Sequence, residues 1–364
     1  MNPITFLTLV AGLVLLVIGA EFLVKGASKI AAILQISPLI IGLTIVAYGT
    51  SAPEMSVSIM STYSNQGDIA VGNVVGSNIC NILLVLGMSS VVAPLLVTKQ
   101  IIRSDVPIMI GVSLLLLMFG LDGQISRVDG IILFVGAALY TLSLIYQSSK
   151  QGAEQDEFTE EYGFSGEVTS ALWLKNIVFV IGGSILLVLG SRFLVKSAVE
   201  IATSFGVSEL LIGLTIVAFG TSLPELATSV VASFRGETDI AVGNVLGSNI
   251  FNILAVLGVA GALSPTGITV AKSIIHFDLL VAIAVALVCL PIFYSGKRID
   301  RWEGLLFLFY YLAYNGYLVL NAVDSQILPT YKAIVLYVVI PLTIIGVIVA
   351  AILEKQAENK RKGI

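Results

Sequence analysis

Two glutamates, Glu54 and Glu225, each stand alone in a long uncharged apolar stretch. An ionised side chain costs about 2.5–3.5 kcal/mol at the centre of a membrane helix on insertion scales, so an acid in such a place is a functional-site hypothesis by default. Neither glutamate has a Lys or Arg within its own apolar stretch to offset the charge. Their carboxylates are therefore candidates for binding a cation.

Each glutamate belongs to a pair of motifs that the chain contains twice. Residues 42–55 (GLTIVAYGTSAPEM) recur at 213–226 (GLTIVAFGTSLPEL), and residues 68–87 (DIAVGNVVGSNICNILLVLG) recur at 239–258 (DIAVGNVLGSNIFNILAVLG). Both recurrences have the same offset of 171 residues, so the segment between the motifs keeps its length. The sequence thus predicts one cation site built from two equivalent halves.

The proline of the first motif is expected to break its helix. Pro53 lacks a backbone donor and its ring clashes with the carbonyl four residues earlier, at Gly49. We expect a kink or unwound turn that frees carbonyls near Ala47, Gly49 and Thr50, which is tolerated at membrane depth only inside protein or beside a wet cavity. The same argument applies to Pro224 in the repeat.

The side chains around the two breaks supply oxygen and little else. They are Thr50, Ser51, Glu54, Ser77 and Asn81, and in the repeat Thr221, Ser222, Glu225, Ser248 and Asn252. The motifs contain no cluster of Cys or His. Hard cations such as calcium and sodium prefer oxygen ligands, so these are the expected ions.

The composition is that of an all-α polytopic membrane protein. The 364 residues are 57% hydrophobic and 12% charged, against about 25% charged in soluble domains. The net charge of −4 and the sparse basic residues exclude a nucleic-acid partner. No nucleophile or metal constellation indicates an enzyme, and we expect no cofactor and no obligate protein partner; the surroundings are the lipid bilayer.

Segments of about 20 apolar residues predict transmembrane helices. Eleven are found, at 4–24, 38–62, 69–93, 105–121, 128–147, 174–194, 209–233, 240–263, 275–295, 302–321 and 332–353. They divide the chain into a first repeat (1–150, spans 1–5), an acidic linker (151–173), a second repeat (174–325, spans 6–10), and an extra helix with a basic tail (326–364). The linker could be a regulatory calcium loop, but it lacks the ligand pattern of an EF-hand, and a solvated linker is favoured.

The offset of 171 residues contains five spans, an odd number. The second repeat must then enter the membrane from the opposite side, which is the inverted-repeat arrangement of many secondary transporters. Basic residues concentrate on the cytoplasmic side of membrane proteins. An external N-terminus places fourteen Lys and Arg inside and five outside, so we expect the C-terminus in the cytoplasm and the protein in the plasma membrane.

At these residues the chain resembles the calcium/cation antiporter superfamily, and specifically its sodium/calcium exchanger branch. GTSAPE…GNVVGSNICN and GTSLPE…GNVLGSNIFN are similar to the paired alpha-repeats of that family. The resemblance covers spans 1–10. It implies ten core helices in two inverted halves and the exchange of calcium for sodium by alternating access.

The resemblance also implies a ligand for each ion. Calcium would lie centrally on Glu54 and Glu225, with carbonyl oxygens from Thr50 and Thr221. The positions that complete the central ring or flank it with sodium are Asn81 and Asn252, and Ala47, Ala218, Ser51, Ser222, Ser77 and Ser248.

Two features depart from the exchanger pattern. Some relatives have Asp at the position of Asn252, where it is linked to potassium co-transport, so Asn argues against potassium dependence. The eleventh span is more typical of the proton/calcium branch, although that branch usually has a GNA-type motif before the glutamate. Calcium/proton exchange is therefore the alternative, and a cation channel is a distant one.

Overall fold

The computed structural model describes residues 3–151, 169–206, 212, 216, 218–294 and 296–346, and these are almost entirely helical. The first half contains α1 (Pro3–Leu34), α2 (Pro38–Ile41), the π-helical η1 (Gly42–Val46), α3 (Ala47–Thr50), α4 (Ala52–Tyr63), α5 (Gly67–Cys80), η2 (Asn81–Leu86), α6 (Gly87–Val92), β1 (Leu95–Leu96), η3 (Ile101–Asp105), α7 (Val106–Gly120), β2 (Gln124–Ile125) and α8 (Arg127–Gln151). The rest contains α10 (Ser170–Ser204), α12 (Ala218–Gly220), α13 (Leu223–Phe234), α14 (Thr238–Phe251), η5 (Asn252–Leu257), α15 (Gly258–Leu263), β3 (Ile268–Thr269), η6 (Ile274–Asp278), α16 (Leu279–Tyr294), β4 (Arg298–Ile299), α17 (Arg301–Ala322), α18 (Leu328–Ile334) and η7 (Val335–Val339).

Nine helical stretches of the described residues are long and apolar enough to cross a membrane, which confirms the polytopic all-α class. Two of the eleven predicted spans, 38–62 and 209–233, are not continuous helices; in their place the structure has the shorter apolar segments Pro38–Thr50 and Leu223–Phe234. Most of the predicted acidic linker, residues 152–168, lies outside the described residues, as does the basic tail after residue 346.

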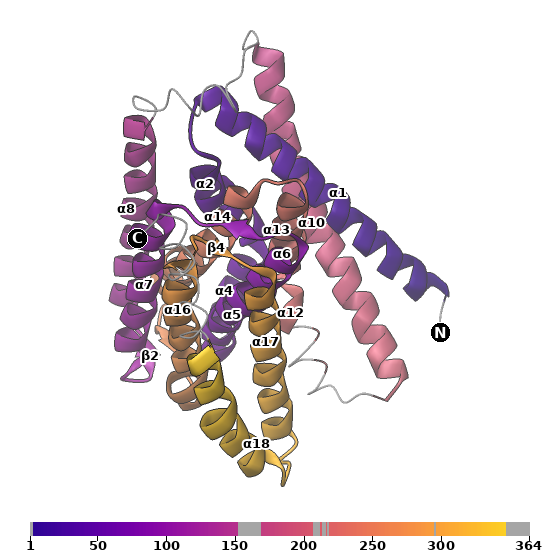
Figure 1. Cartoon of the computed structure of the whole chain (residues 1–364). Helices are drawn as coiled ribbons and strands as arrows, with labels where there is room; N and C mark the ends of the chain where they lie inside the picture. Colours follow the sequence, from indigo (N-terminus) through magenta and orange to yellow (C-terminus); the bar gives the residue numbers. More distant parts are fainter. Residues whose placement is uncertain are drawn as a thin grey trace, which may run out of the picture.

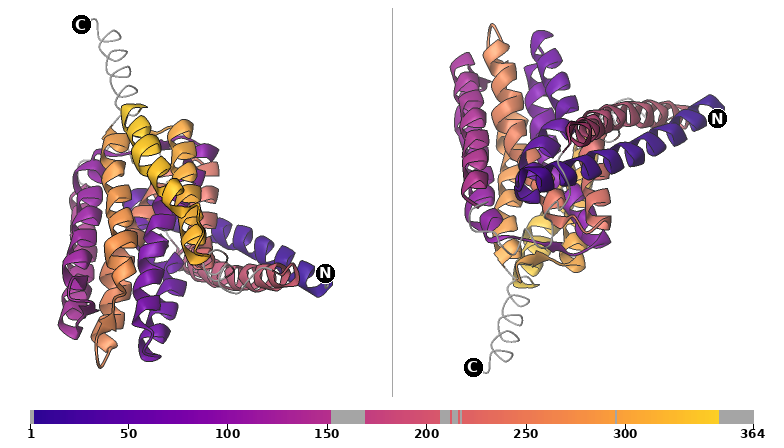
Figure 2. Two further views of the ribbon diagram at one scale, coloured as in Figure 1. Left: turned by 90° about the horizontal axis from the view of Figure 1, so that it is seen from below. Right: turned by 90° about the horizontal axis from the view of Figure 1, so that it is seen from above.

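The first helix of each half is much longer than predicted. α1 has 32 residues and α10 has 35, each about 50 Å at 1.5 Å per residue, against about 30 Å of hydrocarbon. Helices of this length must tilt or project. Figures 1 and 2 show α1 and α10 side by side, slanting across the other helices and projecting beyond them at the N-terminal end of α1.

Glycines let α1 and α10 touch backbone to backbone. A Cβ at Gly19 would lie 2.8 Å from the carbonyl oxygen of Gly183, and one at Gly12 would lie 2.9 Å from that of Gly190. Because contacts so close leave no room for a side chain, only glycine fits these positions. The two long helices therefore form one closely packed pair.

Two short antiparallel strand pairs fix the relative orientation of the halves. β1 pairs with β4, and β2 pairs with β3. β1 and β2 flank η3 and α7, a stretch long enough to span, so the two pairs lie at opposite ends of this span. β1 and β3 each follow the third apolar helix of their repeat, yet they belong to different pairs. Equivalent loops thus lie on opposite sides, which is the geometry of an inverted repeat.

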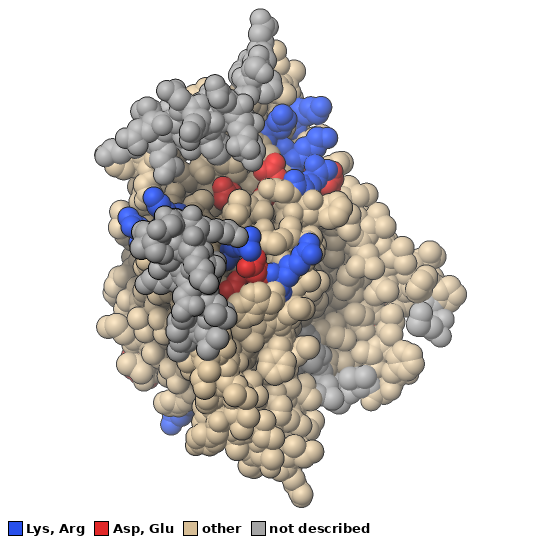
Figure 3. Space-filling view, viewed as in Figure 1, with Lys and Arg blue, Asp and Glu red and all other residues tan. Residues whose placement is uncertain are grey.

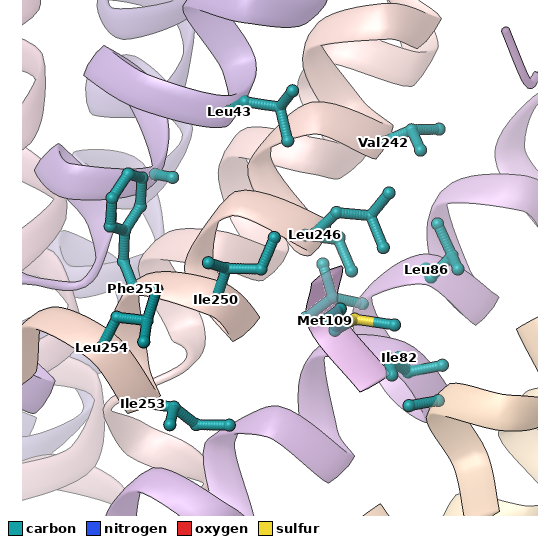
Figure 4. Close-up of a cluster of buried hydrophobic side chains, with 14 of the residues drawn as sticks. Leu43, Ile82, Leu86, Met109, Val242, Leu246, Ile250, Phe251, Ile253 and Leu254 are labelled. Atoms are coloured by element: carbon teal, nitrogen blue, oxygen red, sulfur yellow. The ribbon is translucent and has the colours of Figure 1, made fainter. Parts of the chain in front are cut away.

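The helices that carry the second motif form the centre of the molecule. α14 is almost wholly buried, and its Gly243 and Gly247 press on the backbone of Leu39 and Leu43 in the α2–η1 segment. Figure 4 shows Leu246 of α14 near Met109 of α7 and Leu43 of η1 in the apolar cluster. Around this centre the basic side chains are unevenly placed: in Figure 3 Lys and Arg gather on the upper half of the visible face.

Candidate cation site

Both motif helices break where the prolines predict. α3 ends at Thr50 and α4 begins at Ala52, with Ser51 at φ −80° and ψ 8° between them. In the repeat α12 ends at Gly220 and α13 begins at Leu223, and Ser222 has the matching φ −84° and ψ 4°. The breaks place Glu54 and Glu225 in the first turns of α4 and α13. Helix N-termini favour negative charge, so each carboxylate is held where the backbone supports it.

The carbonyls at the breaks differ from the expectation. The carbonyl of Gly220, which Pro224 cannot serve, accepts the hydroxyl of Ser191 on α10 at 2.5 Å. The carbonyl of Ala47 was expected to be free, but it accepts the Ser51 N–H at 3.0 Å and the Thr50 hydroxyl at 3.3 Å. An unwound turn at Ser51 still reaches back to Ala47, so that part of the expectation is wrong in this conformation.

The two glutamates are completely buried, and each has one satisfied and one unsatisfied oxygen. Glu54 accepts the Ser77 hydroxyl on Oε1 at 3.3 Å, and Glu225 accepts the Ser51 hydroxyl on Oε1 at 3.2 Å. Oε2 of both residues is buried without a hydrogen-bond partner. Because buried polar atoms are almost always partnered, these two equivalent carboxylate oxygens are candidates for coordinating a cation.

The asparagines of the second motif show the same pattern. Asn81 donates from Nδ2 to Oδ1 of Asn249, and Asn252 donates from Nδ2 to Oδ1 of Asn78, both at 3.1 Å. These bonds turn Oδ1 of Asn81 and Asn252 the other way, and both oxygens are buried without a partner. Asn78 also donates from Nδ2 to the backbone carbonyl of Asn249 at 3.1 Å. Each half therefore contributes one carboxylate and one amide oxygen that lack donors.

The threonines and serines link the two halves across the site. Thr50 donates to Oδ1 of Asn244 at 3.0 Å and lies 3.5 Å from the Ser248 hydroxyl. In the mirrored arrangement Thr221 donates to Oδ1 of Asn73 at 3.4 Å and lies 3.4 Å from the Ser77 hydroxyl. The break of one repeat thus rests on the second motif of the other.

The hydrogen bonds that hold the broken helices in place were not predicted from the sequence. Asn73 donates to the backbone carbonyl of Glu54 at 3.3 Å, and Asn244 donates to that of Glu225 at 3.4 Å. Their amides also bond the hydroxyls of Ser58 and Ser229, one turn farther along α4 and α13. The sequence feature that indicates this role is the repeated Gly-Asn dipeptide, which contains Asn73 in one half and Asn244 in the other.

The remaining candidate positions, the alanines and serines at the two helix breaks, differ between the halves in their hydrogen bonds. Ala47 is buried in the first turn of α3, and Ala218 begins α12. Ser222 is buried and its hydroxyl has no partner, whereas its counterpart Ser51 bonds Glu225. The two halves of the site therefore differ in their hydrogen bonds, although their sequences are nearly identical.

The oxygen set suits a hard cation. Within the described part of the chain no three His, Cys, Asp or Glu side chains come together, so amide, hydroxyl and carbonyl oxygens must complete the coordination of any ion on the two carboxylates. Calcium accepts six to eight such oxygens. Glu54, Glu225, Asn81 and Asn252 are all completely buried, so bulk water does not compete with their oxygens for a bound ion.

Comparison with known proteins identifies the family of the chain. The family model described as sodium/calcium exchanger protein matches residues 4–146 and 175–320. The chain belongs to this family. It is accordingly an integral multi-pass membrane transporter, a calcium/cation antiporter, and not an enzyme.

Individual relatives cover most of the chain. It is 40% identical over 289 residues to the inner membrane protein YrbG of Escherichia coli, spanning 77% of this chain and 87% of that protein. It is 32% identical over 345 residues to the sodium/calcium exchanger MaX1 of Methanosarcina acetivorans, spanning 86% and 98%. Among solved structures it is similar to the sodium-calcium exchanger NCX_Mj soaked without Na⁺ and Ca²⁺, with a TM-score of 0.73, 30% identity, and coverage of 86% and 98%.

Proposed function

We propose that this protein exchanges calcium for sodium by alternating access about the ring of Glu54, Glu225, Asn81 and Asn252. The observation that carries the proposal is the set of four buried oxygens without donors, one carboxylate and one amide oxygen from each half. A cation between the halves would complete all four at once. A permanent channel does not need a buried site with inverted halves, whereas an exchanger does.

Calcium is the proposed central ion because its charge matches the ring. Two carboxylates supply about −2, which one calcium ion neutralises, and neutral amide and hydroxyl oxygens complete the shell. Sodium is proposed to bind at the flanking positions, which are Ser51, Ser77, Ser222, Ser248, Ala47 and Ala218. MaX1 and NCX_Mj are both named as sodium/calcium exchangers, which supports the same pair of ions here.

We also infer that exchange does not require potassium and that the N-terminus lies outside the cell. Asn81 and Asn252 leave the ring without a third carboxylate, so we infer no potassium requirement. The distribution of Lys and Arg favours an external N-terminus in the plasma membrane. Sodium would then enter the cell as calcium leaves.

Calcium uptake into proteoliposomes distinguishes sodium from proton coupling. Vesicles containing the purified protein and sodium are diluted into sodium-free medium with radioactive calcium, in parallel with choline-loaded vesicles and with vesicles carrying only a pH gradient. We expect uptake with the sodium gradient alone. Uptake driven only by the pH gradient would assign the chain to calcium/proton exchange, and uptake without any counter-ion gradient would indicate a channel.

A further inference from the structure

A second intramembrane acid is duplicated outside the cation ring. Asp105 ends the π-helical turn η3, with the sequence IIRSD, and Asp278 ends η6, with the sequence IIHFD. Each accepts a tyrosine hydroxyl on Oδ1: Tyr140 of α8 donates to Asp105 at 3.3 Å, and Tyr314 of α17 donates to Asp278 at 2.8 Å. The two aspartates are 173 residues apart, two more than the 171-residue offset of the motifs.

The surroundings of the two acids differ. Asp105 is completely buried, and its Oδ2 has no hydrogen-bond partner. Asp278 is half-buried and is not among the unsatisfied groups of the described residues. The side chain of Gln100 reaches the carboxyl of Asp105, yet its buried Nε2 makes no hydrogen bond of good geometry. Oδ2 of Asp105 and the amide of Gln100 thus lie close together without a hydrogen bond of good geometry between them.

Asp105 has no cation to balance an ionised carboxylate. The ion pairs of the described residues, Glu21–Arg235 and Arg298–Asp300, lie elsewhere, and Arg103 on the same turn is exposed. On the helices that pack nearby, α8 and α16, the hydrogen bond that the structure gives to Asp105 comes from Tyr140, an uncharged donor. Burying an isolated charge is far more costly than burying a neutral carboxylic acid.

We propose that Asp105, which accepts the Tyr140 hydroxyl and lies beside Gln100, is a proton-binding site separate from the cation ring and holds its proton in this conformation. The proton on Oδ2 makes that oxygen a donor. Turning the Gln100 amide then presents its oxygen as the acceptor, since an amide offers a donor and an acceptor on opposite sides. Tyr140 continues to donate to Oδ1. Both carboxyl oxygens of Asp105 are then hydrogen-bonded without a net charge.

An aromatic contact connects this proton to the ring. Tyr140 packs edge-on against Phe251 with ring centroids 5.8 Å apart, and Phe251 packs on Tyr48 at 4.0 Å. Phe251 immediately precedes Asn252, and Tyr48 lies between Ala47 and Thr50. Loss of the proton would leave a buried charge beside Tyr140, and any shift of Tyr140 to accommodate that charge would reach Phe251 and Tyr48, behind both halves of the ring.

Infrared spectroscopy tests the proton directly and does not depend on transport activity. The C=O stretching band of a protonated carboxylic acid is followed against pH in a Glu54→Gln, Glu225→Gln background, which removes the acids of the ring. We expect a carboxylic acid band at neutral pH that Asp105→Asn eliminates and that the matched Asp278→Asn variant retains. A band unchanged by Asp105→Asn would overturn the proposal.

Two further measurements guard against misfolding and test the consequence. Tyr140→Phe should keep the proton but shift the band to higher frequency, because Oδ1 loses its donor; disappearance of the band in this variant would also contradict the proposal. Asp105→Asn mimics the protonated acid. In the otherwise native protein its calcium flux should match the wild type at low pH and diverge from it as the pH rises, and identical pH profiles would refute the link to the ring.

Discussion

Replacing either ring glutamate by Gln tests the site most directly. In Glu54→Gln the side chain still offers Ser77 an acceptor, but the unpartnered Oε2 no longer contributes a full charge. Glu225→Gln is the equivalent change, with Ser51 as the conserved donor. Each variant therefore keeps the shape and one hydrogen bond of the site while halving its charge.

The expected loss follows from the burial of the pair. Removing one partner of a buried ion pair costs about 3–5 kcal/mol. At 1.36 kcal/mol per tenfold change this is about a 10²–10⁴-fold weaker calcium affinity. Without calcium the variants should be no less stable than the wild type, because each loses an uncompensated buried charge.

Thermal unfolding with and without calcium measures both effects. A ligand at 1,000 times its Kd stabilises the folded protein by about 4.1 kcal/mol, and at its Kd by about 0.4 kcal/mol. Calcium at 1,000 times the wild-type Kd should stabilise either variant by about 1.4 kcal/mol or less, and vesicle flux should nearly vanish. Glu200→Gln on α10, whose carboxylate accepts the Thr5 hydroxyl at 2.8 Å outside the ring, is the matched control and should behave as the wild type. Near-normal calcium stabilisation and flux in both ring variants would refute the site.

Two other predictions concern charge and the last helix. The two carboxylates supply a charge of about −2, and three sodium ions, the third on the flanking oxygens, would leave the loaded site near +1. Exchange should therefore be electrogenic. Moving one charge through 100 mV is worth about 2.3 kcal/mol, or about a 50-fold change in the calcium gradient at equilibrium. Calcium flux that ignores a clamped membrane potential would favour an electroneutral cycle. Truncation before Tyr331 should leave exchange intact, because every residue of the proposed ring precedes it in the sequence. It should lower the melting temperature, since bonds such as that of Tyr331 to the Ala313 carbonyl at 2.7 Å are lost. A well-folded truncation without exchange would place the last helix in the mechanism.

Local chemistry made much of this protein readable from its sequence. The duplicated motifs, the odd number of spans between them, the helix breaks before Pro53 and Pro224, and the oxygen-only ligand set all follow from residue type and spacing. Proline lacks a donor wherever it stands, and an isolated carboxylate is costly in any apolar surroundings. Such arguments need no knowledge of which helices meet.

Contacts between helices could be decided only by the tertiary structure. Ser51 donates to the glutamate of the other repeat, while the hydroxyl of its counterpart Ser222 has no partner, although the two motifs are nearly identical. The choice depends on where the two broken helices cross, and glycine contacts such as Gly243 on Leu39 set that crossing. The pairing of Asp105 with Tyr140 likewise joins residues on different spans. Spacing places a residue on a helix face, but the packing of that face against a neighbour decides which hydrogen bonds it makes.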